Sequence, residues 1–195
     1  MTDKIKYAII GAGCMGQEHI LNIEIIEDAK VVALCDTSEQ SIKESLELLN
    51  NEVAIFEDYN ELVRANIADA FIIATPNFTH IDVLKDVMKS EAHLLIEKPL
   101  CTTVKDCQEF EELSKNYPGV IWTAMEYRYM PPVQRMIQEI HNKTIGDLKM
   151  LSIREHRFPF LHKVDEWNRF TIKTGGTLVE KCCHFFDLMR LIAKS

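Results

Sequence analysis

Short apolar runs alternate with longer amphipathic stretches through the first two thirds of the chain. The runs are almost wholly nonpolar, as in strands buried on both faces of a parallel sheet. They predict strands at residues 6–10, 30–35, 70–74, 93–96 and 120–125. The intervening stretches repeat their apolar residues at helical spacing and predict helices at 16–27, 38–49, 59–65, 80–90 and 103–116. This alternation predicts an α/β fold with a doubly wound parallel sheet and right-handed crossovers.

The pattern changes after Tyr127, and we place a boundary there between a first domain, 1–126, and a second, 127–195. Beyond the boundary, the spacing predicts a helix at 133–141, a half-exposed strand at 148–158, an irregular segment at 165–174 and a helix at 177–194. A single strand leaves both of its edges unpaired and forms no stable sheet. We therefore expect the second domain to be the start of an α+β domain whose open sheet is incomplete.

The composition narrows the class of protein. The 195 residues include 30 acidic and 22 basic side chains, which gives a formal net charge of −8 and argues against nucleic acid or an anionic membrane as a partner. No apolar run is long enough to span a membrane, and the N-terminus lacks signal-peptide character. The six cysteines contain no C-x-x-C pair. Together these features predict a reduced, cytoplasmic protein without a disulfide scaffold or a zinc site.

A glycine-rich turn joins the first predicted strand to the first predicted helix. Its sequence is Gly11-Ala12-Gly13-Cys14-Met15-Gly16. In a dinucleotide site, Gly11 permits the tight turn, Gly13 lets the backbone approach the pyrophosphate, and Gly16 lets the helix pack on the strand. The N-terminus of the helix offers free N–H groups to the phosphates. We therefore predict that residues 11–16 bind a dinucleotide.

Asp36 ends the second predicted strand, about 20 residues after the last glycine of this turn. An acid at this spacing binds the 2′-hydroxyl of the ribose and repels a 2′-phosphate. The predicted cofactor is therefore NAD, with NADP less favoured.

Two further loops follow predicted strands and are expected to face the same crevice, because ligands bind at the carboxyl ends of parallel strands. They are Ala74-Thr75-Pro76-Asn77 and Glu97-Lys98-Pro99. Lys98 is placed to hold a substrate oxygen by a charge-assisted hydrogen bond. Pro99 stiffens the turn, with a cis bond as one option. The alternatives are an ordinary turn for the first loop and a surface Glu-Lys pair for the second.

The last predicted helix carries Glu180 and His184, four residues apart and thus on one face, with Asp187 three residues further. A carboxylate beside an imidazole makes a general acid/base unit for the proton of a secondary alcohol. The alternatives are a surface pair, a satisfied core histidine, and a Glu/His metal pair that lacks obvious third and fourth ligands. Cys182 and Cys183 fit small buried helix residues better than a redox pair.

These motifs occur in an order that resembles the Gfo/Idh/MocA oxidoreductase family. The resemblance covers the whole chain and is specific through the combination rather than through any one motif. Its elements are Gly11-x-Gly13-x-x-Gly16, Ala74-Thr75-Pro76-Asn77 with His80, Glu97-Lys98-Pro99, Tyr127-Arg128, Trp167-x-Arg169 and Gly175-Gly176-x-x-x-Glu180-x-x-x-His184-x-x-Asp187.

The resemblance implies a Rossmann domain followed by a domain with a large open sheet, which commonly forms the oligomer interface. It implies hydride transfer between NAD(P) and a sugar or polyol, and a homo-oligomer for a full-length form. Lys98 would bind the reacting oxygen, His184 would be the acid/base, and Glu180 would support the site. The residues implied to lie along the cofactor, the last two near its nicotinamide end, are Thr75, Pro76, Asn77, His80, Glu97, Lys98, Arg128, Trp167 and Arg169.

Two features depart from the family pattern. The position of Glu180 is more often Asp, and the extra methylene of Glu moves the carboxylate outward. Family members also run well beyond Ser195, so we expect this chain to be C-terminally truncated. Truncation leaves two alternatives to an enzyme: a catalytically incomplete dinucleotide-binding module, and a structural or regulatory protein that only inherits the fold.

Overall fold

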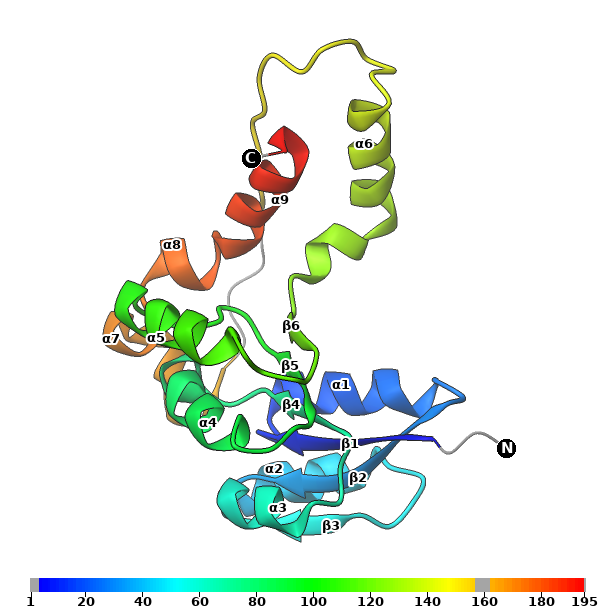
Figure 1. The fold of residues 1–195 in the computed structure, drawn as a ribbon, viewed down its shortest axis with the longest axis vertical. Helices are drawn as coiled ribbons and strands as arrows, with labels where there is room; N and C mark the ends of the chain where they lie inside the picture. Colours follow the sequence, from blue (N-terminus) through cyan, green and yellow to red (C-terminus); the bar gives the residue numbers. More distant parts are fainter. Residues whose placement is uncertain (1–3, 157–161, 195) are drawn as a thin grey trace.

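The fold is built around one six-stranded sheet (Figure 1). The structure is a computed structural model that describes residues 4–156 and 162–194. Its strands are β1 (Ile5–Ile10), β2 (Ala29–Cys35), β3 (Ala54–Phe56), β4 (Ala70–Ile73), β5 (His93–Ile96) and β6 (Ile121–Thr123). Their order is β3-β2-β1-β4-β5-β6, and every neighbouring pair is parallel. The order reverses between β1 and β4, which is the switch point where such sheets bind ligands. The predicted doubly wound α/β fold is confirmed.

Helices cover both faces of the sheet. One face packs on α1 (Cys14–Glu24) and α2 (Glu39–Leu46), and the other packs on α3 (Tyr59–Ala65), α4 (His80–Val87) and α5 (Val104–Ser114). A short helix, η1 (Asn77–Thr79), leads directly into α4.

Alternate residues of the central strands serve the two faces. On β1, Ala8 and Ile10 join the core beneath α3, α4 and α5, whereas Ile9 joins the core beneath α1 and α2. On β4, Ile73 joins the core beneath α3, α4 and α5, and Ile72 joins the core beneath α1 and α2. Burial on both faces explains why these strands appear in the sequence as continuous apolar runs.

The edge strand β3 was not predicted. It has only three residues, and Ile55 at its centre is half exposed, so no sustained apolar run marks it. Short, partly exposed edge strands carry the weakest pattern in a sheet.

The helices described after β6 are short. They are η2 (Glu126–Tyr129), α6 (Pro131–His141), η3 (Val164–Arg169), α7 (Thr171–Thr174), α8 (Thr177–Glu180) and α9 (Cys183–Ala193). α6 and α9 pack against each other at the end of the molecule remote from the sheet (Figure 1). The predicted division into domains 1–126 and 127–195 stays a prediction.

Three predictions for this part are wrong in whole or in part. Residues 148–156 form no strand, because no described strand lies beside them to complete its hydrogen bonds, and residues 157–158 lie outside the described residues. The prediction of an irregular segment at 165–174 is wrong in part: Thr171–Thr174 forms α7, whereas left-handed backbone at Asp165 and Glu166 interrupts η3. The helix predicted at 177–194 is two helices, interrupted at Lys181 and Cys182.

Within the described part of the chain, no helix has the length and apolarity needed to cross a membrane.

Candidate functional site

The glycine loop between β1 and α1 is tightly packed at two positions and open at a third. Gly11 has φ +98°, and a Cβ there would lie 2.5 Å from the carbonyl carbon of Ala74. A Cβ at Gly16 would lie 2.1 Å from the carbonyl oxygen of Gly11, because α1 starts directly against the end of β1. A Cβ at Gly13 would meet nothing within 4 Å. That open space is the approach a pyrophosphate needs to reach the amides at the start of α1, where Cys14 and Met15 lie.

The carboxylate of Asp36 is fixed by the backbone at the end of β2. One oxygen accepts the N–H of Ala12 at 2.7 Å, and the other accepts the N–H of Ser38 at 2.8 Å. The carbonyl of Ala12 is itself held by the hydroxyl of Ser45 at 2.9 Å. Because an ionised carboxylate has about four acceptor sites, Asp36 keeps the capacity to accept ribose hydroxyls.

The loop after β4 places Thr75, Pro76 and Asn77 at the same edge of the sheet. Thr75 Oγ1 accepts the hydroxyl of Thr79 at 2.8 Å. Asn77 is 6% exposed, and its Nδ2 has no hydrogen-bond partner among the described residues. A buried amide donor without a partner costs free energy until a ligand atom satisfies it. Together with the open space at Gly13, this orphan donor fits a bound dinucleotide.

His80 lies beneath this loop and is fully buried. Its Nε2 is 3.0 Å from the carbonyl oxygen of Thr75, and its Nδ1 is 3.0 Å from that of Pro99. Burial lowers the pKa of the imidazole below its ordinary value. Since its two ring nitrogens face the carbonyls of Thr75 and Pro99, His80 packs beneath both the loop after β4 and the loop after β5.

Glu97 and Lys98 follow β5, and the Lys98–Pro99 peptide bond is cis. Glu97 is 6% exposed, and its Oε1 lies 2.8 Å from Nε2 of His19 on α1. Lys98 Nζ donates to the carbonyl oxygen of Glu180 at 3.4 Å. In a continuous helix, that carbonyl would accept the N–H of His184. The break between α8 and α9 leaves it available to Lys98.

His184 lies in the first turn of α9 and is 2% exposed. Its Nε2 is 3.3 Å from Oε1 of Glu126, and its ring stacks on Tyr127 with the ring centres 4.1 Å apart. The expected pairing of His184 with Glu180 on one helix face is wrong, because the helix is broken between them. The Glu180 carboxylate pairs instead with Lys181 at 2.8 Å. Glu126 is the acid beside the imidazole.

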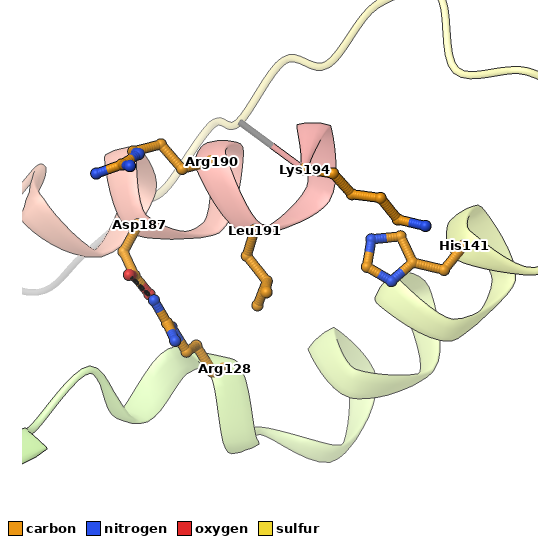
Figure 2. Close-up of a pocket in the computed structure, with 6 residues that line it drawn as sticks. All are labelled: Arg128, His141, Asp187, Arg190, Leu191 and Lys194. Carbon is orange, nitrogen blue, oxygen red and sulfur yellow. Dashed lines mark hydrogen bonds and ion pairs between the residues drawn. The ribbon is translucent and has the colours of Figure 1, made fainter.

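Arg128 and Asp187 connect η2 to α9 (Figure 2). The guanidinium donates through two nitrogens to both carboxylate oxygens, and this hydrogen bonding raises the pKa of Arg128. Arg128, predicted as a cofactor contact, thus fixes the helix that carries His184. The pair borders a cavity of about 410 Å³ whose other lining residues are His141, Arg190, Leu191 and Lys194.

Trp167 and Arg169, predicted near the nicotinamide end, lie on η3. Arg169 is more than half exposed and pairs with Glu166 at 3.0 Å. η3 packs on α7, and α7 in turn contacts η1, which holds Asn77. Through α7, the structure connects these two residues to the loop that holds Asn77.

The Cys183 thiol donates to the same Glu180 carbonyl that accepts from Lys98, with a sulfur–oxygen distance of 3.6 Å. All six cysteines are free, and Cys182 and Cys183 are half buried beside the helix break rather than inside one helix. The described residues contain no group of three or more His, Cys, Asp or Glu side chains placed to hold a metal.

Sequence reasoning missed His19 and Glu126. His19 lies three residues after Gly16 on α1, and nothing in the local pattern distinguishes it from a surface helix residue. Glu126 follows β6 much as Glu97 follows β5. The rule that functional side chains gather at the carboxyl ends of strands, applied to β6 as well, predicts it.

Comparison with known proteins identifies the family. A model described as "Oxidoreductase family, NAD-binding Rossmann fold" (Gfo/Idh/MocA) matches residues 5–125, and the model of that family's C-terminal alpha/beta domain matches residues 137–194. The first match confirms NAD as the predicted cofactor.

Individual relatives agree. Myo-inositol 2-dehydrogenase from Thermotoga maritima is 27% identical over 188 residues, which are 96% of this chain and 54% of that protein. A putative myo-inositol dehydrogenase from Sinorhizobium meliloti superposes with a TM-score of 0.84 at 20% identity, over 98% of this chain and 56% of that one. A third relative is scyllo-inositol dehydrogenase from Lactobacillus casei, whose structure was solved with NAD(H) and scyllo-inositol. It has a TM-score of 0.79 at 19% identity, over 97% of this chain and 56% of that one. The chain thus spans about half the length of these relatives. It belongs to the Gfo/Idh/MocA family of oxidoreductases.

Proposed function

We propose that this chain contains the cofactor site and the reacting groups of a dehydrogenase that oxidises a secondary alcohol of a polyol or sugar. NAD, when bound, supplies the hydride acceptor. The glycine loop binds its phosphates, Asp36 binds its ribose, and Asn77 donates the amide that lacks a partner in the protein. The preference for a polyol rests on the inositol dehydrogenases among the relatives.

The reaction removes a hydride from the carbon of the alcohol and a proton from its oxygen, leaving a ketone. Lys98 donates a hydrogen bond to that oxygen and stabilises the negative charge that develops as the proton leaves. His184 accepts the proton as general base. Glu126, 3.3 Å away, orients the ring and stabilises the imidazolium that forms.

The observation that carries this proposal is the contact between Lys98 Nζ and the carbonyl of Glu180. It brings a lysine from the carboxyl edge of the sheet to the turn directly before His184. A cation and an imidazole held together beside a dinucleotide loop are the groups that alcohol oxidation needs.

The test combines binding with turnover. Calorimetric titration with NAD is expected to show one site, and formation of NADH is expected with at least one member of a panel of inositols and hexoses. Lys98→Ala and His184→Ala are expected to lower kcat by roughly 100-fold or more, in line with the contribution of acid–base and electrostatic groups. NAD affinity is expected to change little in His184→Ala.

Matched controls are Lys105→Ala on α5 and His93→Ala at the opposite end of β5, which are expected to keep wild-type rates. Tight NAD binding without NADH formation would instead identify a dinucleotide-binding module. Unchanged rates in both site variants would contradict the assigned roles.

A further inference from the structure

Two histidines contact the segment that carries Lys98: His19 on its N-terminal side and His80 on its C-terminal side. His19 of α1 binds Oε1 of Glu97 at 2.8 Å, and the other oxygen of Glu97 accepts the backbone N–H of Lys98 at 3.2 Å. This carboxylate is almost completely buried and therefore needs partners of this kind. The N-terminal side of Lys98 is thus tied to α1.

The C-terminal side is tied to α4. Nδ1 of His80 lies 3.0 Å from the carbonyl oxygen of Pro99 and 3.3 Å from that of Leu100. Nε2 of the same ring lies 3.0 Å from the carbonyl oxygen of Thr75. The buried ring thus lies between the loop after β5 and the loop after β4, and its one N–H, when it is neutral, donates to a carbonyl of either loop according to the tautomer.

Each of these histidines belongs to a helix that directly follows a cofactor loop. α1 begins in the glycine loop, and α4 follows the loop of Thr75 and Asn77. The two imidazoles therefore connect both cofactor loops to the backbone on either side of Lys98. Neither histidine needs to touch the substrate to act in this way.

We propose that His19 and His80 are positioning residues that fix Lys98 relative to the bound dinucleotide. The proposal rests on the proposed function, in which Lys98 holds the reacting oxygen. It assigns His80 to the support of Lys98 and of the loop after β4, rather than to the cofactor surface.

The ring geometry permits a test by substitution. A glutamine amide nitrogen lies close to where Nε2 of histidine lies, and an asparagine amide nitrogen lies close to Nδ1. His19→Gln is therefore expected to keep the contact with Glu97, and His19→Ala loses it. His80→Asn keeps the contact with Pro99, His80→Gln keeps the contact with Thr75, and His80→Ala loses both.

The first readout is independent of turnover. Lys98 is acetylated with a limiting active ester, and its labelling rate relative to Lys105 is measured by peptide mass spectrometry well below the unfolding temperature. His19→Ala and His80→Ala are expected to speed labelling of Lys98 about threefold to tenfold, the effect of losing one or two hydrogen bonds. His19→Gln and His80→Asn restore most of the protection. His93→Ala on β5 is the matched control and leaves the rate unchanged.

The second readout is the kinetics of polyol oxidation. Misplacement of Lys98 is expected to lower kcat by about tenfold or more in both alanine variants, since such errors of position are costly. KM for the polyol is expected to change less. If the wild type forms no NADH, the proposed function fails, and the labelling comparison still decides whether the two histidines hold Lys98.

A purely structural role gives a different result. The alanine variants would then have lower unfolding temperatures, while the labelling rate of Lys98 and kcat per folded molecule would stay at wild-type values. That result would overturn the proposal.

Discussion

Gly13 and Gly16 lie three residues apart in one loop, yet a methyl group meets different surroundings at each. At Gly16 the added carbon would overlap the backbone of Gly11, whereas at Gly13 it would enter open space. The two positions therefore separate folding from binding, although both belong to the same motif.

Gly16→Ala is expected to destabilise the fold by roughly 1–3 kcal/mol, as overpacking does. Gly13→Ala is expected to lower the free energy of unfolding by less than about 1 kcal/mol, since the substitution only replaces a favourable N-cap residue of α1 by a less favourable one. It is expected to weaken NAD binding roughly tenfold or more, because the methyl group fills the approach of the pyrophosphate. Urea unfolding and calorimetry measure the two effects. Equal stability losses in both variants would contradict this account of the loop.

His80 gives a residue-scale prediction about pH. Burial lowers its pKa in the folded protein below the ordinary value of 6.5. Just below pH 6.5, the imidazole is therefore protonated in the unfolded chain and neutral in the folded chain. Stability from this source is complete above pH 6.5 and is lost as the pH falls below it. Glu97, the charged group that acts on the ring, raises the pKa and only reduces the effect.

His80→Asn removes this titration while keeping the amide donor toward Pro99. The free energy of unfolding of the wild type is therefore expected to fall more steeply between pH 7.5 and pH 5.5 than that of His80→Asn. Urea unfolding at both pH values checks this. Parallel changes in the two proteins would show that His80 does not carry the dependence.

The local sequence predicted where the candidate site residues lie better than it predicted which residues they contact. The glycine loop, Asp36 and Lys98 could be identified because backbone conformation and strand ends fix their positions locally. The partner of His184 could not, because the pairing with Glu126 depends on how α9 docks on η2. Local spacing favoured Glu180 instead, and it failed because helical spacing applies only within an unbroken helix.

Among the helices and strands too, those fixed by local sequence were predicted and those fixed by tertiary contacts were not. Strands buried on both faces were predictable from apolar runs alone, and β1, β2, β4 and β5 lie where the runs lie. The edge strand β6 was also predicted, although Trp122 at its centre is half exposed. The edge strand β3 was missed, and the strand at 148–158 was wrong, because pairing with a neighbour decides whether such segments become strands. The break before α9 was not predictable from local spacing, and it leaves the carbonyl of Glu180 to accept a tertiary hydrogen bond from Lys98.

The pair of Arg128 and Asp187 gives an element-scale prediction, because it is an ion pair that links η2 to α9. Asp187 is mostly buried, whereas Arg128 is more exposed. Asp187→Asn and Arg128→Gln are each expected to destabilise the protein, and a double-mutant cycle is expected to give a coupling of about 1 kcal/mol or more. The exposed pair of Lys115 and Glu112 on α5 is the matched control, with an expected coupling below about 0.5 kcal/mol. A coupling for Arg128 and Asp187 no larger than the control would contradict a role in docking α9.

At the scale of the whole molecule, the candidate site is assembled from three parts of the chain. The glycine loop and the loops after β4 and β5 supply the cofactor edge, the segment after β6 supplies Glu126, and the turn between α8 and α9 brings His184. Sequence order alone placed these motifs in the family, while their meeting at one edge follows from the parallel sheet.

The central claim is that a hydride passes from a polyol carbon to NAD at this edge. The most direct measurement uses an inositol deuterated at its ring carbons, NAD and a stoichiometric amount of the protein, with mass spectrometry of the nicotinamide product. We expect NADH that carries one deuterium, with the yield greatly reduced in Lys98→Ala and His184→Ala. Tight binding of NAD with no deuterated NADH from any inositol or hexose tested would contradict this claim.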